Sequence, residues 1–171
     1  YKRRDLLLEH MDELTYLVAY ENGKAWEEAK GDVLKAKEAT EQAISAPSLM
    51  MGESLMDASA GYDTVLYREP LGVFAGIVPF NFPAMIPMGW MVPLCIAAGN
   101  TIVVKASSTT PMNAMRLLEL LAEAGPPPGV VSAITAGRGH AQLLLTDSRL
   151  TGVCVVGTTP LGPKTPAAPA A

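Results

Sequence analysis

The chain has 171 residues, with 13 Lys and Arg against 17 Asp and Glu, which gives a formal charge of −4. Hydrophobic residues make up 49% of the chain and charged residues only 18%, a balance that excludes an intrinsically disordered protein. No basic cluster is denser than Lys2-Arg3-Arg4, so we expect no nucleic-acid partner.

The amino-terminal third of the chain predicts helices. Residues 5–21 repeat apolar side chains every three or four positions with acidic residues between them, which is typical of an amphipathic helix. Asn22-Gly23 is a helix stop signal, and a second helical pattern covers residues 26–44. Residues 48–61 are expected to form a loop and a short helix. Weak alternation over residues 64–68 predicts an edge strand.

From residue 72 onward, short apolar runs alternate with helical patterns. The expected strands cover residues 72–79, 101–105, 130–134 and 152–156, and the expected helices cover residues 84–98, 110–124 and 139–146. Thr110 is expected to cap its helix, with Pro111 in the first helical position. Continuous apolar strands are typical of a parallel sheet with helices on both faces. The sequence therefore predicts an α/β fold, in which amino-terminal helices precede a partial doubly wound, Rossmann-like parallel sheet.

The composition also predicts a domain organisation. Residues 1–61 form the expected amino-terminal helical segment, and residues 62–159 the expected dinucleotide-binding α/β domain. In residues 160–171 proline recurs at every third position among Ala, Gly and Thr. That repeat excludes a helix or a central strand, and it predicts a polyproline-like or disordered tail.

No charged residue occurs between Glu69 and Lys105, a stretch long enough to cross a bilayer as a helix. Four prolines interrupt it, at positions 79, 83, 87 and 93. Each proline removes a backbone hydrogen bond that lipid cannot replace. We therefore expect no association with a membrane.

The two cysteines, Cys95 and Cys154, lie in apolar runs. Buried free cysteine behaves as a small hydrophobic residue, so both are expected to be reduced thiols in the core. The start of the chain has no signal-peptide pattern. Together these features favour a cytoplasmic protein.

Polar residues follow three of the expected strands, at the sheet edge where ligands bind in doubly wound folds. Asn81 could stabilise an oxyanion through its amide, or it could be a turn residue bonded to its own backbone. Lys105 could bind a ribose or phosphate, or it could extend from a strand end into water. Gly157-Thr158-Thr159 could cradle a phosphate or form a plain turn. The histidines and cysteines lack the spacing of a metal site, so no metal is expected.

Three segments resemble the aldehyde dehydrogenase superfamily: PLGVFAGIVPFNFPAMIP (70–87), AGNTIVVK (98–105) and EAGPPPGVV (123–131). The branch resembles the CoA-acylating methylmalonate-semialdehyde dehydrogenases, through PFNFPAMIP, the upstream Gly31-Asp32-Val33 and SLMMGE (48–53). The match covers residues 5–159 in order. It implies that the sheet is part of that family's cofactor domain.

The resemblance implies NAD as cofactor and an aldehyde as substrate. In the family the aldehyde forms a thiohemiacetal on a catalytic cysteine, hydride passes to NAD, and in this branch CoA takes the acyl group. The family also implies a homo-oligomer for the full-length protein. We further expect self-association of this chain, because a partial sheet leaves an open edge and an uncovered apolar face.

The resemblance also implies roles for single residues. Asn81 falls at the oxyanion-hole asparagine, and Val78 and Phe80 fall where the loop backbone lines the nicotinamide. Lys105 matches the lysine that holds the adenosine ribose, with the hydroxyls of Ser108 and Thr109 beside it. We expect Asn81 and Lys105 to face a shared crevice.

At the last expected strand, Gly157 and Thr158 match the family's glycine-serine pair at the pyrophosphate. The family usually has a glutamate three residues after the lysine, where this chain has Ser108, so the preference between NAD and NADP stays open. Gly89 looks like an added residue in the helix after the Asn81 loop.

The catalytic cysteine and the general-base glutamate of the family lie downstream of the region matched here. Neither Cys95 nor Cys154 falls at the nucleophile position. Two hypotheses follow: the chain is the cofactor-binding portion of an aldehyde dehydrogenase and is inactive alone, or it is a non-catalytic nucleotide-binding module that acts with a partner.

Overall fold

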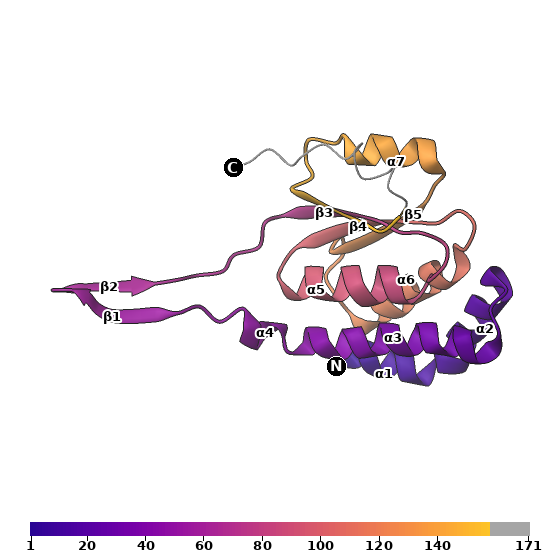
Figure 1. Ribbon diagram of the computed structural model, residues 1–171, viewed down its shortest axis with the longest axis horizontal. Coiled ribbons are helices and arrows are strands. Elements are labelled where there is room, and N and C mark those ends of the chain that lie inside the picture. The colour runs from indigo at the N-terminus through magenta and orange to yellow at the C-terminus, as the bar shows by residue number, and fades with distance from the viewer. Residues whose placement is uncertain (158–171) are drawn as a thin grey trace.

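The computed structural model describes residues 1–157 (Figure 1). Its helices are α1 (Lys2–Glu9), α2 (Met11–Asn22), α3 (Trp26–Ile44), α4 (Ala46–Leu49), the π-helix η1 (Ile86–Met91), α5 (Val92–Ala97), α6 (Met112–Ala124) and α7 (Arg138–Leu145). Its strands are β1 (Ser54–Ser59), β2 (Tyr62–Val65), β3 (Val73–Ile77), β4 (Thr101–Ala106), β5 (Val131–Thr135) and β6 (Gly152–Val155).

Four strands form a parallel sheet in the order β5-β4-β3-β6. Helix α7 covers one face, and α5 and α6 lie on the other, with α1 and α3 in a further layer beyond them (Figure 1). This arrangement confirms the predicted α/β fold with amino-terminal helices and a parallel sheet. Because all four strands run the same way, their carboxyl ends meet at one edge.

One hydrophobic core joins the amino-terminal helices to the sheet. Leu7, Leu14 and Val33 from the helices belong to the same buried cluster as Ile102 and Val104 from β4. The predicted boundary between residues 61 and 62 falls at the turn between β1 and β2. The three-part division of the chain remains a prediction, and residues 160–171 lie outside the described residues.

The single helix predicted over residues 5–21 is wrong, because the chain forms α1 and α2 with a break at His10. The His10 N–H still donates to Leu6 O, and His10 O accepts from Leu14 N–H. Because hydrogen bonding continues across the break, the residues on both sides of it keep helical spacing. The apolar repeat in the sequence therefore gives no sign of the break.

The loop and short helix predicted over residues 48–61 are also wrong in part. Helix α4 ends at Leu49, and residues 54–65 form an antiparallel hairpin, with β2 ending before the predicted strand 64–68 is complete. Every residue of β1 and β2 is exposed, so neither strand needs one apolar face. The hairpin extends from the body as a long arm (Figure 1).

The continuous helix predicted over residues 84–98 is interrupted at its start, where η1 precedes α5. Each hydrogen bond of a π-helix spans five residues rather than the four of an α-helix, which is how a helix accommodates an extra residue. The buried Gly89 lies in this segment, and a Cβ built on it would be 3.0 Å from Ala36 Cα in α3. Glycine at this position therefore permits the close approach of η1 and α3.

Three further expectations need correction. Thr110 does not cap α6: its hydroxyl donates to Phe80 O at 3.2 Å, and the helix begins at Met112. Cys154 is not buried, because β6 is an edge strand of the sheet and leaves this side chain exposed. Cys95 is only half-buried.

None of the helices within residues 1–157 has the length and apolar character needed to cross a membrane.

Candidate functional site

A cavity of about 240 Å³ opens at the carboxyl ends of the parallel strands. Strands β3 and β4 pair so that Ile77 lies opposite Lys105, and the chain after β5 and β6 closes the sides. The lining residues are Ile77, Val78, Pro79, Phe80, Lys105, Ser107, Ser108, Ala136, Ala141, Val156 and Gly157. Ligands of doubly wound sheets bind at this edge.

Lys105 supplies the cation of this cavity. Its side chain is buried, with an exposed fraction of 8%, and its Nζ donates a hydrogen bond to Ala136 O at 3.1 Å. Burial lowers the pKa of this ammonium group, because the charged form loses hydration. An ammonium group has three N–H donors, so a ligand oxygen in the cavity can accept from it.

The loop after β3 carries the second predicted group. Val78 and Phe80 line the cavity, whereas Asn81 is exposed and is not among the lining residues, so Asn81 and Lys105 do not share this cavity as expected. Phe80 O accepts from Asn22 Nδ2 at 2.7 Å and from Thr110 Oγ1 at 3.2 Å. The loop backbone is therefore held firmly, while the Asn81 side chain lies at the surface beside the cavity.

Hydroxyl groups follow β4, as predicted. Ser107 and Ser108 line the cavity, whereas Thr109 lies next to it and donates its backbone N–H to Ser107 Oγ at 3.1 Å. Gly157 lines the opposite side. Thr158 lies outside the described residues. Of the predicted residues that the structure describes, the cavity brings together five: Val78, Phe80, Lys105, Ser108 and Gly157.

Sequence reasoning missed the polar residues of α2 and α3 that hold the loop and the start of α6. Glu21 accepts hydrogen bonds from the N–H groups of Met112 at 2.7 Å and Asn113 at 2.9 Å, so it caps α6 from another helix. Burial raises the pKa of Glu21, and these two hydrogen bonds partly oppose the rise. Asp32 is buried in α3. In the sequence, the available signal was an acid on the apolar side of the predicted helix. A charged residue in such a position is seldom fully buried without a partner.

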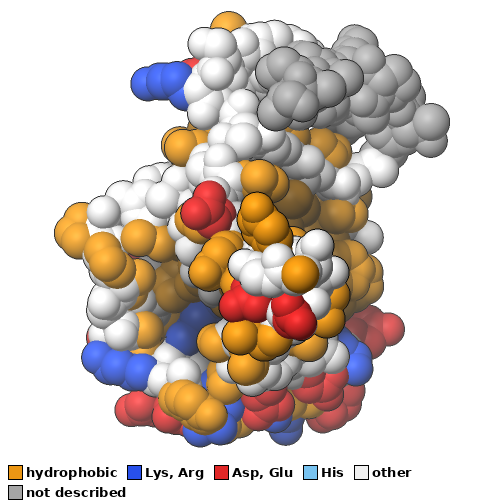
Figure 2. Space-filling model, turned by 90° about the vertical axis from the view of Figure 1, so that its left-hand side faces the viewer, with side chains coloured by type: hydrophobic (Ala, Val, Ile, Leu, Met, Phe, Trp, Pro, Cys, Tyr) orange, Lys and Arg blue, Asp and Glu red, His pale blue; other side chains and the backbone are white. Residues whose placement is uncertain are grey.

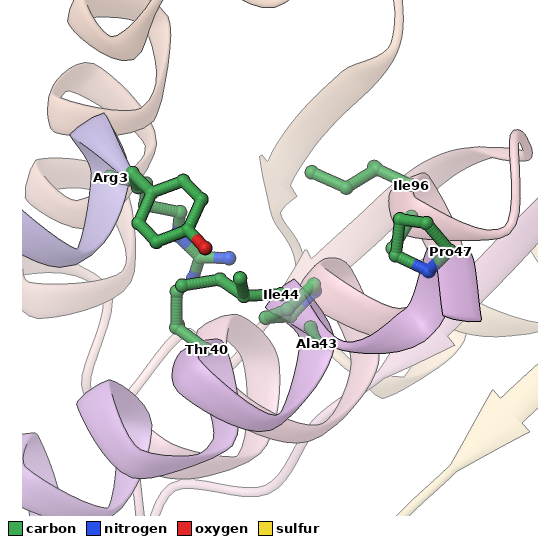
Figure 3. Close-up of a pocket in the computed structure, with 9 residues that line it drawn as sticks. Arg3, Thr40, Ala43, Ile44, Pro47 and Ile96 are labelled. Carbon is green, nitrogen blue, oxygen red and sulfur yellow. The ribbon is translucent and has the colours of Figure 1, made fainter. Parts of the chain in front are cut away.

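Two further cavities lie away from the strand ends. One, of about 290 Å³, is lined by Arg3, Thr40, Ile44 and Ile96 among others, with Arg3 reaching from α1 toward α3 (Figure 3). Arg3 donates to Met88 O, and burial lowers the pKa of its guanidinium to about 10. The other is an apolar groove of about 520 Å³ that both thiols line.

Within residues 1–157 no group of three or more His, Cys, Asp or Glu side chains could hold a metal ion.

The family model for the aldehyde dehydrogenase family matches residues 1–171. The chain belongs to the aldehyde dehydrogenase family. The resemblance deduced from the three segments is therefore confirmed.

Individual relatives agree with the predicted branch. The malonate-semialdehyde dehydrogenase of Bacillus cytotoxicus is 47% identical over 161 residues, which are 94% of this chain and 33% of that protein. The crystal structure of methylmalonate-semialdehyde dehydrogenase from Oceanimonas doudoroffii has a TM-score of 0.91 and 38% identity, and the match covers 95% of this chain and 33% of that one.

A third relative was solved with a bound cofactor. This methylmalonate-semialdehyde dehydrogenase candidate from Sinorhizobium meliloti, in complex with NAD, has a TM-score of 0.92 and 38% identity, and the match covers 96% of this chain and 33% of that one. The chain thus spans about one third of the length of the relatives that it matches.

Proposed function

We propose that the chain is the cofactor-binding portion of an NAD-dependent dehydrogenase that oxidises malonate or methylmalonate semialdehyde, with CoA as the acyl acceptor. The observation that carries the proposal is the cavity at the strand ends, where Lys105 is buried. The loop after β3, whose sequence resembles that of the family, lines the same cavity. The relatives that are named for these semialdehydes support the substrate class.

The residues around the cavity suit a dinucleotide. Lys105 would donate to the hydroxyl groups of the adenosine ribose, with Ser108 and Thr109 next to it as further hydrogen-bonding groups. The backbone of Val78 and Phe80 would line the nicotinamide side, and Gly157 with Thr158 would lie at the pyrophosphate. When bound, NAD would supply the hydride acceptor.

Asn81 would act on the substrate rather than on the cofactor. Its exposed side-chain amide can donate to an oxyanion that develops on the aldehyde carbon, and one such donor contributes about 3–4 kcal/mol to the stability of a transition state. Its position outside the cavity lining suits this role, because the aldehyde would approach from beyond the nicotinamide side.

We propose that this chain does not turn over by itself. Burial and the nearby Cys154 raise the pKa of Cys95 to about 11, so Cys95 is almost entirely protonated at neutral pH and is a poor nucleophile. Cys154 lies on an edge strand, outside the cavity lining. NADH formation from a semialdehyde with CoA, abolished by Cys95→Ser or Cys154→Ser, would overturn this part of the proposal.

Calorimetric titration with NAD tests the cofactor site. We expect saturable binding by the wild-type chain and at least a tenfold weaker affinity in Lys105→Ala, because a hydrogen bond to a charged group contributes about 1.5–3 kcal/mol. Lys35→Ala removes an exposed lysine of α3 and serves as the matched control. Flat heats from a folded wild-type chain would contradict a cofactor site built by these residues.

The alternative is a non-catalytic nucleotide-binding module that acts with a partner. The exposed apolar groove beside β6, lined by Phe74, Trp90 and Leu94, favours it because an uncovered apolar surface is typical of a docking face. We also propose that the chain self-associates. Both candidates expect NAD binding by the isolated chain, whereas flat heats would favour a fragment without a working cofactor site.

A further inference from the structure

The loop that carries Asn81 is anchored on both sides by polar groups from other elements. Before Asn81, Phe80 O accepts hydrogen bonds from Asn22 Nδ2 at 2.7 Å and Thr110 Oγ1 at 3.2 Å. After Asn81, the Met85 N–H donates to Asp32 Oδ1 at 2.8 Å. The exposed amide of Asn81 is therefore presented by a backbone that is fixed both before and after it.

The second anchor is an ion pair that reaches two parts of the loop. Asp32 is fully buried in α3, and its Oδ2 accepts from Lys24 Nζ at 3.2 Å. The same ammonium group lies 4.0 Å from the centroid of the Phe82 ring, which is cation–π distance. The nearby Ala84 N–H also opposes the rise in the pKa of Asp32. One pair of charges thus contacts both Phe82 and Met85.

This pair is a costly way to obtain stability. Burying a carboxylate removes its hydration, and a buried ion pair often contributes no more than apolar side chains of the same volume would. Burial is also the main cause that raises the pKa of Asp32, against its hydrogen bonds and Lys24. What the pair does provide is direction, since the carboxylate accepts from the Met85 N–H while its partner ammonium lies against the Phe82 ring, and the two contacts together fix where the loop lies.

The packing of α3 against η1 brings the acid to this place. Asp32 contacts Met85, and one helical turn further along both segments Gly89 lies against Ala36. The absence of a side chain on Gly89 lets the two segments approach closely, which brings the Asp32 carboxylate within hydrogen-bond distance of the loop backbone.

We propose that Lys24 and Asp32 are positioning residues, which hold the loop 79–85 so that the Asn81 amide is fixed in one orientation. The role of that amide rests on the function proposed above. The clamp itself is a physical property of the loop, so it can be measured without cofactor or substrate, and the two proposals can fail separately.

Hydrogen exchange of the backbone amides tests the clamp in the 171-residue chain. We expect Lys24→Met and Asp32→Asn to accelerate exchange at the Met85 amide at least tenfold more than they accelerate exchange at the amides of β4. Lys24→Arg should restore protection, because it keeps both the charge and the cation–π contact. Lys24 is partly exposed, so its variants should fold even if Asp32→Asn does not.

The matched controls are Lys35→Met and Glu38→Gln, which break an exposed ion pair on the same helix with an N–O distance of 2.7 Å. They should leave exchange in the loop within about twofold of wild type, since an exposed pair contributes little. Unchanged protection at Met85 in Lys24→Met would overturn the proposal. So would equal acceleration in the loop and in β4, because that result describes a general loss of stability.

Discussion

Gly89 in η1 packs directly against Ala36 in α3: a Cβ on Gly89 would lie 3.0 Å from the Cα of Ala36. The atom in the way belongs to a backbone, which cannot rotate aside as the end of a side chain can. The contact lies one turn from the Asp32–Met85 hydrogen bond, so it also governs how α3 meets the loop that carries Asn81.

We expect Gly89→Ala to destabilise the chain by about 1–3 kcal/mol, which is the usual effect of an extra methyl group in a packed core. Urea unfolding measures the change. Gly31→Ala is the control: it lies in α3, a Cβ there meets nothing within 4 Å, and it should stabilise by about 0.5–1 kcal/mol. Equal effects of the two substitutions would contradict the close contact.

The two thiols should differ in reactivity. With the pKa of Cys95 raised to about 11, only about one molecule in a thousand carries its thiolate at pH 8, whereas Cys154 is exposed on an edge strand. Iodoacetamide at pH 8 should therefore modify Cys154 at least tenfold faster, as followed by mass spectrometry of the peptides. Cys154→Ser should leave only the slow reaction, and Cys95→Ser only the fast one. Faster labelling of Cys95 would contradict its burial.

Lys105 predicts a dependence of stability on pH. Burial lowers its pKa in the folded chain, so between that value and the ordinary lysine pKa the unfolded chain binds more protons. In this window the contribution of Lys105 to stability rises with pH. We expect the free energy of unfolding of wild type, minus that of Lys105→Met, to increase as the pH rises toward 10.5, the ordinary pKa of lysine. A difference that stays constant or falls would show that Lys105 is not desolvated.

Ser108 predicts weak discrimination between NAD and NADP. Among the described residues, the cavity lining contains a lysine and two serines but no carboxylate, and an acidic residue is the usual partner of the ribose 2′-hydroxyl in NAD sites. Ser108→Glu should raise the ratio of NAD affinity to NADP affinity at least tenfold, because glutamate accepts from the hydroxyl and repels the 2′-phosphate. Calorimetric titration of both cofactors measures the ratio. Ser48→Glu, an exposed substitution in α4, should leave it unchanged.

The hairpin arm predicts self-association. Leu55 and Tyr62 are among its exposed apolar side chains, and Figure 2 shows hydrophobic side chains over the face from which the arm projects. Light scattering should give a mass above 18.0 kDa for wild type, and Leu55→Lys with Tyr62→Lys should lower it, since lysine on an edge strand opposes pairing. Leu143→Lys, on α7, is the control. A monodisperse wild-type monomer would rule the prediction out.

Local patterns were sufficient for most of the elements of the sheet. Apolar runs located β3, β4, β5 and β6. In the two central strands, β3 and β4, burial on both faces requires a continuous apolar run, whereas β5 and β6 are apolar although they are partly exposed edge strands. The same patterns failed at the hairpin, whose residues are exposed on both faces. They also failed at His10, where hydrogen bonds continue through the break.

The sequence by itself determined the fold class, the family and the strand ends at which Lys105 and Ser108 would lie, since these depend on residues close together in the chain. Only the tertiary structure decided that Asn81 stays outside the cavity lining, that Glu21 rather than Thr110 caps α6, and that Asp32 and Lys24 hold the loop. Those contacts join residues that are far apart along the chain. They form because the packing of α2 and α3 brings their polar groups to backbone N–H groups that would otherwise be buried without partners.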